Sequence, residues 1–235
     1  LVGSEMCIRD RLNIINFKNI AEATLTFTSG FNCFVGNNGV GKTNVLDAIY
    51  HLSMCKSYFN LPDLQNIRHE EPFFVVQGKY ERGGEELTVY CGVKRGQKKV
   101  FKKNQKAYDK LSEHIGLIPL VMISPEDFIL IDGGSEERRK LVDGIISQCD
   151  RVYLHRLIRY NKALTQRNML LKSAAGKFLD PEMLEVWNEQ LAEHGEAIRQ
   201  KRIAFLKEFR SVFQTYYERL SLGLSLIHIS EPTRP

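Results

Sequence analysis

The chain has 235 residues, of which 43% are hydrophobic and 26% are charged, and its formal net charge is +5. These values are ordinary for a soluble globular protein and allow one large or two modest domains. The longest unbroken apolar run, Leu117 to Ile123, is far shorter than the roughly 20 residues that span a bilayer. We therefore expect no membrane-spanning segment and a cytoplasmic location.

The two ends of the chain differ in character from the rest. Residues 1–11 and 224–235 resemble translated sequencing-adapter reads, so we exclude them from the fold and expect a truncation at the C-terminal end. The four cysteines outside these two end segments form no C-x-x-C pair, so the sequence predicts neither a zinc site nor a disulfide framework. We expect these four to be small buried hydrophobes in a reducing compartment: Cys33, Cys55, Cys91 and Cys149.

Two alternating stretches near the start, residues 12–17 and 23–27, predict a pair of β-strands. The short apolar run of residues 31–35 predicts a further strand that ends at Gly36. After it, Val45, Ile49 and Leu52 are spaced along one helical face, which predicts a helix.

Between this predicted strand and helix lies a complete match to G-x-x-x-x-G-K-[ST], the phosphate-binding P-loop. Its glycines allow positive φ angles and bring backbone N–H groups close to phosphate oxygens. We expect Lys42 to reach the β- and γ-phosphates of ATP, and the Thr43 hydroxyl to complete the shell of a Mg²⁺ ion held through the nucleotide. The predicted nucleotide-binding residues are Gly36, Asn37, Asn38, Gly39, Val40, Gly41, Lys42 and Thr43.

The order of these motifs resembles a known family. A strand that ends in Asn16-Phe17-Lys18-Asn19-Ile20 and then the P-loop is similar to the head ATPases of the SMC and ABC group. The continuation, with Asp47-Ala48-Ile49-Tyr50-His51-Leu52-Ser53 and Lys56-Ser57-Tyr58, resembles more specifically the bacterial recombination-mediator and replication-repair family RecF. The resemblance covers residues 12 to about 223.

Two β-rich runs, residues 73–80 and 87–93, are separated by turn-forming residues and predict a hairpin. A basic stretch follows, made of Lys94, Arg95, Lys98, Lys99, Lys102, Lys103, Lys106 and Lys110. Two interpretations stay open. The stretch is either a solvated hairpin edge or a ribbon that contacts DNA phosphates, with Phe101 and Tyr108 interleaved.

Leu117 to Ile123 predicts a buried strand, and Phe128 to Asp132 then imitates a Walker B strand whose aspartate holds Mg²⁺ through water. Walker B of SMC-type heads carries an acid directly after the aspartate, whereas Gly133 follows here. Residues 134–143 instead resemble the G-x-x-x-R-R-x-x-x-D element of the RecF family. We therefore favour a Walker B motif elsewhere, and keep Asp132 as the less favoured candidate.

From Arg151 the apolar period becomes helical. One predicted helix ends near Gly176, and a second runs from Pro181 to about Leu220 after an N-cap at Asp180. Apolar residues recur every seven positions in both, which predicts an antiparallel pair whose stripes pack as a core. The stripes contain Leu157, Leu164 and Leu171, and Leu184, Leu191, Ile198, Phe205 and Val212.

The resemblance implies an α/β P-loop NTPase fold: an ABC/SMC-type head, incomplete here, with an inserted α-helical hairpin lobe. It places the N-terminal part of the head in residues 12–148 and the helical arm in 149–220. Residues 221–235 would hold the start of a return strand and then the adapter-like tail. We expect no membrane partner.

The resemblance also implies a function. It is that of an ATP-dependent DNA-binding protein of recombinational repair and replication, which acts on single-stranded or gapped DNA. ATP-driven dimerisation of the full-length head and the partners RecR and RecO follow from the same resemblance.

The full-length family is a weak DNA-dependent ATPase. No signature motif, Walker B pair or switch residue is identifiable in residues 12–223, and turnover needs such groups to hold the metal and position water. We therefore predict no catalytic residue and expect the chain to bind ATP without hydrolysing it. The alternative is a self-sufficient small-molecule kinase or NTPase that uses Asp132 as Walker B.

Overall fold

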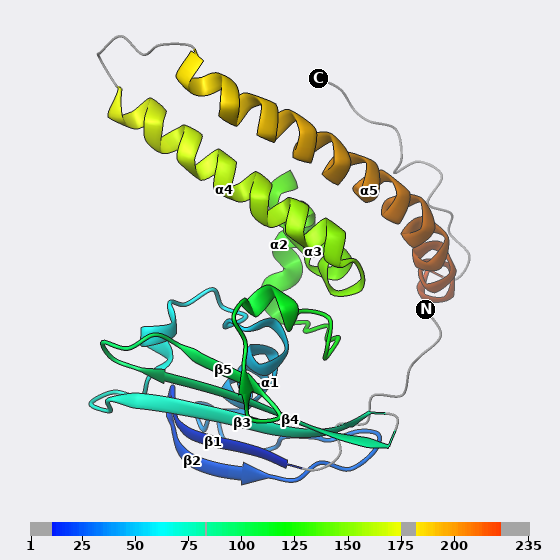
Figure 1. Ribbon diagram of the computed structural model, residues 1–235. Coiled ribbons are helices and arrows are strands. Elements are labelled where there is room, and N and C mark those ends of the chain that lie inside the picture. The colour runs from blue at the N-terminus through cyan, green and yellow to red at the C-terminus, as the bar shows by residue number, and fades with distance from the viewer. Residues whose placement is uncertain (1–10, 83, 175–181, 222–235) are drawn as a thin grey trace. The chain divides into compact units, whose positions relative to one another are not determined.

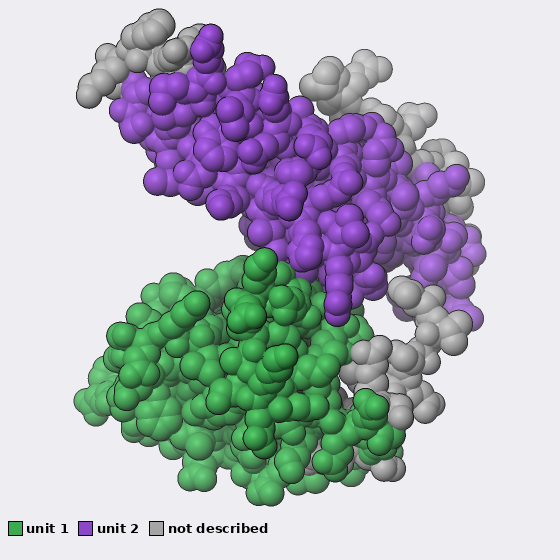
Figure 2. Space-filling model, in the orientation of Figure 1, with its two compact units in different colours: residues 1–128 green, residues 129–235 purple. Residues whose placement is uncertain are grey.

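The computed structural model describes residues 11–82, 84–174 and 182–221. The chain forms two compact units, one running to Phe128 and the other beginning at Ile129 (Figure 2). This division lies earlier than residue 148, where the sequence placed the end of the head. The reason is that α3 (Ser135–Cys149) packs on α4 (Arg151–Ser173) and α5 (Glu182–Leu220).

The first unit is built on an antiparallel sheet with the order β2-β1-β3-β4-β5-β6 (Figure 1). Both predicted strand pairs are confirmed, since β1 pairs with β2 and β3 pairs with β4. Arg11, which the sequence assigned to the adapter-like end, is the first residue of β1 and lies opposite Lys79. The strands are β1 (Arg11–Phe17), β2 (Ile20–Leu25), β3 (Phe73–Arg82), β4 (Glu85–Lys94), β5 (Val100–Lys103) and β6 (Lys106–Ala107).

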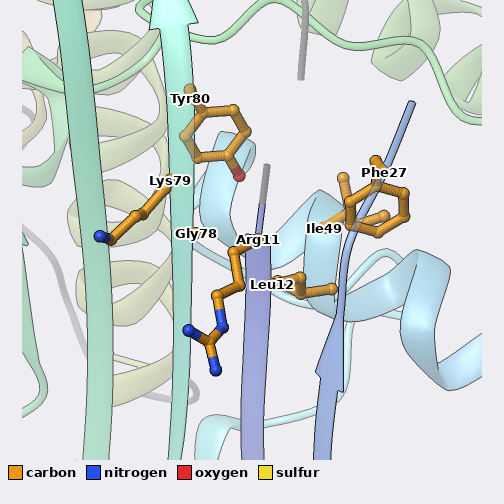
Figure 3. Close-up of a pocket in the computed structure, with 7 residues that line it drawn as sticks. All are labelled: Arg11, Leu12, Phe27, Ile49, Gly78, Lys79 and Tyr80. Atoms are coloured by element: carbon orange, nitrogen blue, oxygen red, sulfur yellow. The ribbon is translucent and has the colours of Figure 1, made fainter. Parts of the chain in front are cut away.

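One face of the sheet carries the core, and helix α1 (Lys42–Met54) packs against it. Alternate residues of β4 are buried, as the pleat of a half-buried strand requires. The approach of helix and sheet is close at Gly78, where a Cβ would lie 2.7 Å from Tyr80 and 2.9 Å from Leu52. Figure 3 shows this end of the core, where Leu12, Phe27 and Ile49 help to line a space of about 10 Å³. That volume holds at most one water molecule.

Two predicted strands are absent. Residues 31–35 and 117–123 are irregular, and Phe31 and Ile123 are 100% and 82% exposed. A strand needs hydrogen-bonding neighbours, and among the described residues no strand pairs with either segment. Only Ile118 of the second run is buried, where its carbonyl oxygen accepts a hydrogen bond from Ser53.

The interpretation of Phe128–Asp132 as a Walker B strand is wrong. Residues Pro125–Phe128 form a 3₁₀ turn and Ile129–Asp132 form the short helix α2. The run of four apolar residues is too short for periodicity to separate a strand from a helix. Two further 3₁₀ turns lie in the first unit, at Asp63–Asn66 and Leu111–Glu113.

The second unit contains an antiparallel helical pair, as predicted. Asp150 lies 2.7 Å from Lys201, and Arg167 donates a hydrogen bond of 2.8 Å to Asn188, so α5 runs back along α4 (Figure 1). The second helix reaches Leu220 as expected, while the predicted N-cap at Asp180 and the end near Gly176 lie outside the described residues.

The seven-residue stripes form a core over only part of their length. Tyr153, Ile146 and Ile198 are buried together, with Leu157 and Phe205 packed beside them. The expectation of core packing is wrong for three members, whose side chains stay exposed because no third element covers them among the described residues: Leu164, Leu171 and Val212. None of the described helices has the length and apolar character that crossing a bilayer requires.

The cysteines divide into two classes. Cys55 and Cys91 are buried, as expected, and burial raises the pKa of each thiol to about 12. Cys33 and Cys149 are exposed, which corrects the sequence expectation. Cys33 lies in the irregular segment that was predicted to be a buried strand, so its exposure has the same origin.

Candidate nucleotide-binding site

The predicted P-loop forms a continuous turn that leads directly into α1. Gly36, Gly39 and Gly41 have φ angles of 149°, 82° and 107°, a region that other residues rarely adopt. All eight predicted site residues lie in this turn and the first two positions of the helix. The prediction that they form one loop before a helix is thus matched by the geometry, although the strand expected before it is absent.

The N-terminus of α1 has the properties of an anion site. Gly41 is its N-cap residue and supplies no side-chain cap, and the first turn contains no acidic residue. The first N–H groups of a helix have no intrahelical acceptor, and the helix dipole favours negative charge at this end. These uncapped donors therefore suit phosphate oxygens.

Lys42 is directed back into the loop. Its ammonium group donates hydrogen bonds of 2.8 Å to the carbonyl oxygen of Gly36 and 2.7 Å to that of Asn37. Among the described residues it makes no ion pair with a carboxylate, so its positive charge is not neutralised locally. Thr43 is exposed beside it at the start of α1. This donor set fits a triphosphate with a Mg²⁺ ion held between the phosphates and the Thr43 hydroxyl.

A residue that the sequence reasoning missed holds the loop in place. Asn19, in the turn between β1 and β2, donates a hydrogen bond of 2.7 Å to the carbonyl oxygen of Gly39. It also accepts one of 2.7 Å from the Asn44 side chain on α1. A Cβ at Gly41 would lie only 2.8 Å from the Asn19 Oδ1 atom, so the glycine is needed for this contact as well as for its φ angle. The one signal in the sequence was the position of Asn19 within the motif that carried the family resemblance.

The same turn fixes α1 through a buried carboxylate. Asp47 is fully buried and forms an ion pair of 2.6 Å with Lys18. Its two oxygens also accept hydrogen bonds from the Ser57 hydroxyl and the Tyr58 backbone N–H. Because the ion pair and both hydrogen bonds meet at one side chain, the helix that begins at the loop is tied to the segments on either side of it.

The basic stretch is divided by the structure. Lys99 is largely buried, and its ammonium group bonds the Cys55 carbonyl oxygen at 2.6 Å and Asp63 at 3.0 Å. Phe101 is 2% exposed and Tyr108 packs against the core, which disfavours the interpretation in which these two rings interleave with the lysines on DNA. Five members remain exposed: Lys94, Arg95, Lys98, Lys106 and Lys110.

Asp63 also approaches His51, whose Nε2 atom lies 3.3 Å from it. Burial lowers the pKa of His51 despite this carboxylate. For Asp63 burial acts to raise the pKa, but the hydrogen bonds from His51 and Lys99 outweigh it and the pKa is lowered. Lys99 and Asp63 are therefore a structural ion pair that ties the β4–β5 region to the end of α1.

Asp132 lies in α2 of the second unit, on a helix and not at the end of a strand. The described residues contain no group of three or more His, Cys, Asp or Glu side chains placed to hold a metal ion. The role of Thr43 as a Mg²⁺ ligand stays a prediction from the sequence.

Comparison with known proteins bears on this site. The family model described as an AAA ATPase domain matches residues 6–218. The chain is 55% identical over 224 residues to the DNA replication and repair protein RecF of Phocaeicola vulgatus, covering 95% of this chain and 60% of that protein. The corresponding protein of Bacteroides thetaiotaomicron is 52% identical, with 95% and 60% covered. The chain therefore spans about three fifths of the length of these relatives.

Solved structures agree with these relatives. The structure of the recombination mediator protein RecF with ATP superposes with a TM-score of 0.84 at 32% identity, covering 90% of this chain and 57% of that one. The RecF structure described with ATPrS gives 0.85 at the same identity and coverage. The predicted fold class, a P-loop ATPase head, is confirmed in its RecF form, and so is the resemblance to RecF. The chain belongs to the AAA ATPase domain family.

Proposed function

We propose that this chain is the nucleotide-binding part of an ATP-dependent DNA-binding protein of replication and recombinational repair. The observation that carries the proposal is the uncapped N-terminus of α1, with Lys42 turned into a loop of three positive-φ glycines. Relatives named as RecF support it. The kinase alternative is not favoured, because Asp132 lies on a helix and the relatives are repair proteins.

In this site the chain's own groups bind and orient the phosphates. The backbone N–H groups of residues 37–43 donate to phosphate oxygens, and Lys42 places its charge on the β- and γ-phosphates. Thr43 would hold a Mg²⁺ ion through its hydroxyl, and the ion would neutralise phosphate charge. Asn19 keeps the loop closed against α1, so that these donors point to one place.

The test is a Lys42→Ala variant, measured for ATP affinity by calorimetry in the presence of Mg²⁺. We expect affinity to fall at least tenfold with the melting temperature unchanged, because the side chain bonds only loop carbonyls and enters no core. Lys79→Ala, an exposed lysine on β3, is the matched control and should bind as the parent does. Equal ATP affinity in the two variants would contradict the assignment.

We also propose that the chain binds ATP without turnover. Hydrolysis needs a carboxylate that fixes the metal and a group that positions water. No Walker B pair is identifiable in residues 12–223, and Asp132 lies on a helix and not at the end of a strand. Phosphate release by the chain should equal that of Lys42→Ala, with or without DNA. An ATPase rate that Asp132→Asn abolishes would revive the kinase alternative.

DNA contact by the exposed part of the basic stretch is a further part of the proposal. Each phosphate contact on duplex DNA contributes about 0.9 to the slope of log affinity against log salt. Replacing Lys98, Lys106 and Lys110 by Gln should therefore flatten the slope by up to about 2.7. A control variant loses three exposed cations elsewhere: Lys79→Gln, Lys207→Gln and Arg210→Gln. Equal slopes in both variants would mean that the basic stretch is only a solvated edge of the hairpin.

The remaining parts rest on the family alone. We infer that ATP draws two full-length heads together, that RecR and RecO are partners, and that the protein acts in the cytoplasm. Sedimentation of a full-length relative with and without ATP, and with each partner, measures these associations directly. A full-length protein that stays monomeric with ATP would refute the first of them.

A further inference from the structure

Helix α4 has an unusual charge distribution. Its 23 residues contain six Lys or Arg side chains and no Asp or Glu. Four basic or titratable residues follow one another at spacings of four, four and three, which places them on one face of the helix. This basic face consists of Arg151, His155, Arg159 and Lys162, and all four are exposed.

Among the described residues no acid of the neighbouring helix forms an ion pair with this face, although Glu193 of α5 lies near Arg159 and Lys162. The first half of α5 carries further glutamates. At about 100° per residue, Glu185, Glu189 and Glu196 lie roughly 160–200° around α5 from Trp187. They therefore lie on the opposite side of α5 from the surface that Trp187 shares with α4.

The basic face borders an open groove of about 540 Å³ between α4 and α5. The groove is lined by Arg159, Lys162, Trp187, Gln190, Glu193 and His194. Trp187 is half-buried there and is the only tryptophan of the chain. The His194 side chain is 8% exposed, and its Nδ1 atom has no hydrogen-bond partner, although it lies 3.9 Å from the Glu193 carboxylate.

Resting on the proposed DNA-binding function, we propose that this groove and the basic face bind single-stranded nucleic acid, as a contact surface separate from the P-loop and from the basic stretch. An unpaired base would stack on Trp187, while Arg159 and Lys162 contact the flanking phosphates and Gln190 bonds a base edge. Aromatic stacking beside a line of cations is the usual arrangement for binding a strand without sequence preference.

The chemistry favours a single strand over the other polyanions. In a duplex the base faces are stacked on one another, so Trp187 could contact only the backbone. The carboxylates of an acidic peptide would pair with the cations, but they offer no planar ring to stack on the half-buried indole of Trp187. The groove volume lies in the range that holds a small organic ligand, which suits one extruded base.

Trp187 is also the reporter for the test. Titration of the full chain with oligo-dT should quench its fluorescence, and duplex DNA or polyglutamate of equal charge should not. For variants, fluorescence anisotropy of a labelled oligo-dT is the readout. Arg159→Gln with Lys162→Gln should weaken binding at least fivefold and flatten the salt slope by about 0.7 per lost contact.

Trp187→Leu should likewise weaken binding at least fivefold with little change in the salt slope, because it removes stacking and not charge. The matched control is Lys207→Gln with Arg210→Gln, which removes two exposed cations at the same spacing on α5 and should bind as the parent does. Binding unaffected by Trp187→Leu, equal loss in the control, or equal quenching by duplex or polyglutamate overturns the proposal. Because Lys42→Ala leaves this surface intact, loss of ATP binding does not decide it.

Discussion

The sharpest consequence of the site is that Asn19, which is not itself one of the predicted nucleotide-binding residues, should control the affinity of the loop for ATP. Asn19→Ala removes the hydrogen bond to the Gly39 carbonyl oxygen and the bond from Asn44. The loop is then free to leave the closed geometry, and the apparent dissociation constant rises in inverse proportion to the fraction of time that the loop stays closed. This effect would act through loop position and not through direct contact.

The size of the effect follows from the two bonds. A net intramolecular hydrogen bond contributes about 0.5–1.5 kcal/mol, and both bonds here are exposed, so their sum lies near the lower limit, roughly 1 kcal/mol. That corresponds to about a fivefold weaker affinity for ATP. Asn44→Ala breaks only one of the bonds and should cost about twofold.

Calorimetric titration with ATP and Mg²⁺ measures these changes, alongside the melting temperature. Asn13→Ala is the control, since Asn13 accepts an exposed hydrogen bond from Thr24 on the same pair of strands but is not bonded to the loop. Its ATP affinity should equal that of the parent. If Asn19→Ala binds ATP as tightly as Asn13→Ala does, the side chain does not position the loop and the reasoning fails.

Two further predictions concern the core of the first unit. Burial lowers the pKa of His51 and of His114, so the unfolded state takes up protons first as the pH falls through about 6.5. The free energy of unfolding should therefore decrease below that pH, by up to about 1.4 kcal/mol per pH unit for each histidine, and His114→Gln should lessen the slope in denaturant titrations. A flat profile between pH 7 and 5.5 would contradict the burial argument. Thiol labelling should separate the cysteines by exposure: Cys33 and Cys149 react in the folded chain, and Cys55 and Cys91 react only on unfolding. Labelling of all four at one rate would refute the packing described for the two buried thiols.

The sequence patterns predicted correctly those elements whose conformation depends on residues close to them in the chain. The P-loop requires glycine at positions of positive φ, and the helices and the β3–β4 hairpin follow the period of their apolar residues. Gly41 illustrates the limit of this information. Its motif position predicted the φ angle, but its second role, leaving room for Asn19, depends on a turn 22 residues earlier and is not visible in the motif.

The failures share one cause, which is dependence on distant partners. Phe31 and Ile123 belong to apolar runs that look like strands, but strand formation requires a neighbour, and no described strand supplies one. Lys99 looks like any other member of a solvated lysine run, but it is paired with Asp63, 36 residues away. Asp132 follows four apolar residues in a run too short for its period to identify a helix.

The helical unit offers a comparison between two carboxylate–arginine pairs, one that joins two helices and one that lies within α5. Asp143 of α3 accepts two hydrogen bonds from Arg202 of α5, at 2.8 and 2.7 Å, and one from the Tyr153 hydroxyl of α4. It thus joins three helices, and its side chain is only 15% exposed. The hydrogen bonds with Asp143 raise the pKa of Arg202, while burial, together with the hydrogen bond to Asp143, raises the pKa of Tyr153. Glu196 also binds Arg199 through two bonds of 2.7 Å, but within one helix turn and more than half exposed.

These two pairs should differ sharply in their contribution to stability, although their bond lengths are alike. Asp143→Ala leaves a half-buried guanidinium and a tyrosine hydroxyl without their acceptor, which costs about 3 kcal/mol for a partly buried pair. Glu196→Gln leaves no buried charge unpaired, because water already solvates both Glu196 and Arg199. Denaturant unfolding followed by the fluorescence of Trp187, which lies in this unit, should show a large shift for the first variant and none for the second. Replacing Asp143 and Arg202 together by leucine should restore part of the loss, because no charge is then left unpaired. Equal effects of Asp143→Ala and Glu196→Gln on the free energy of unfolding would contradict the argument that burial decides how much each pair contributes.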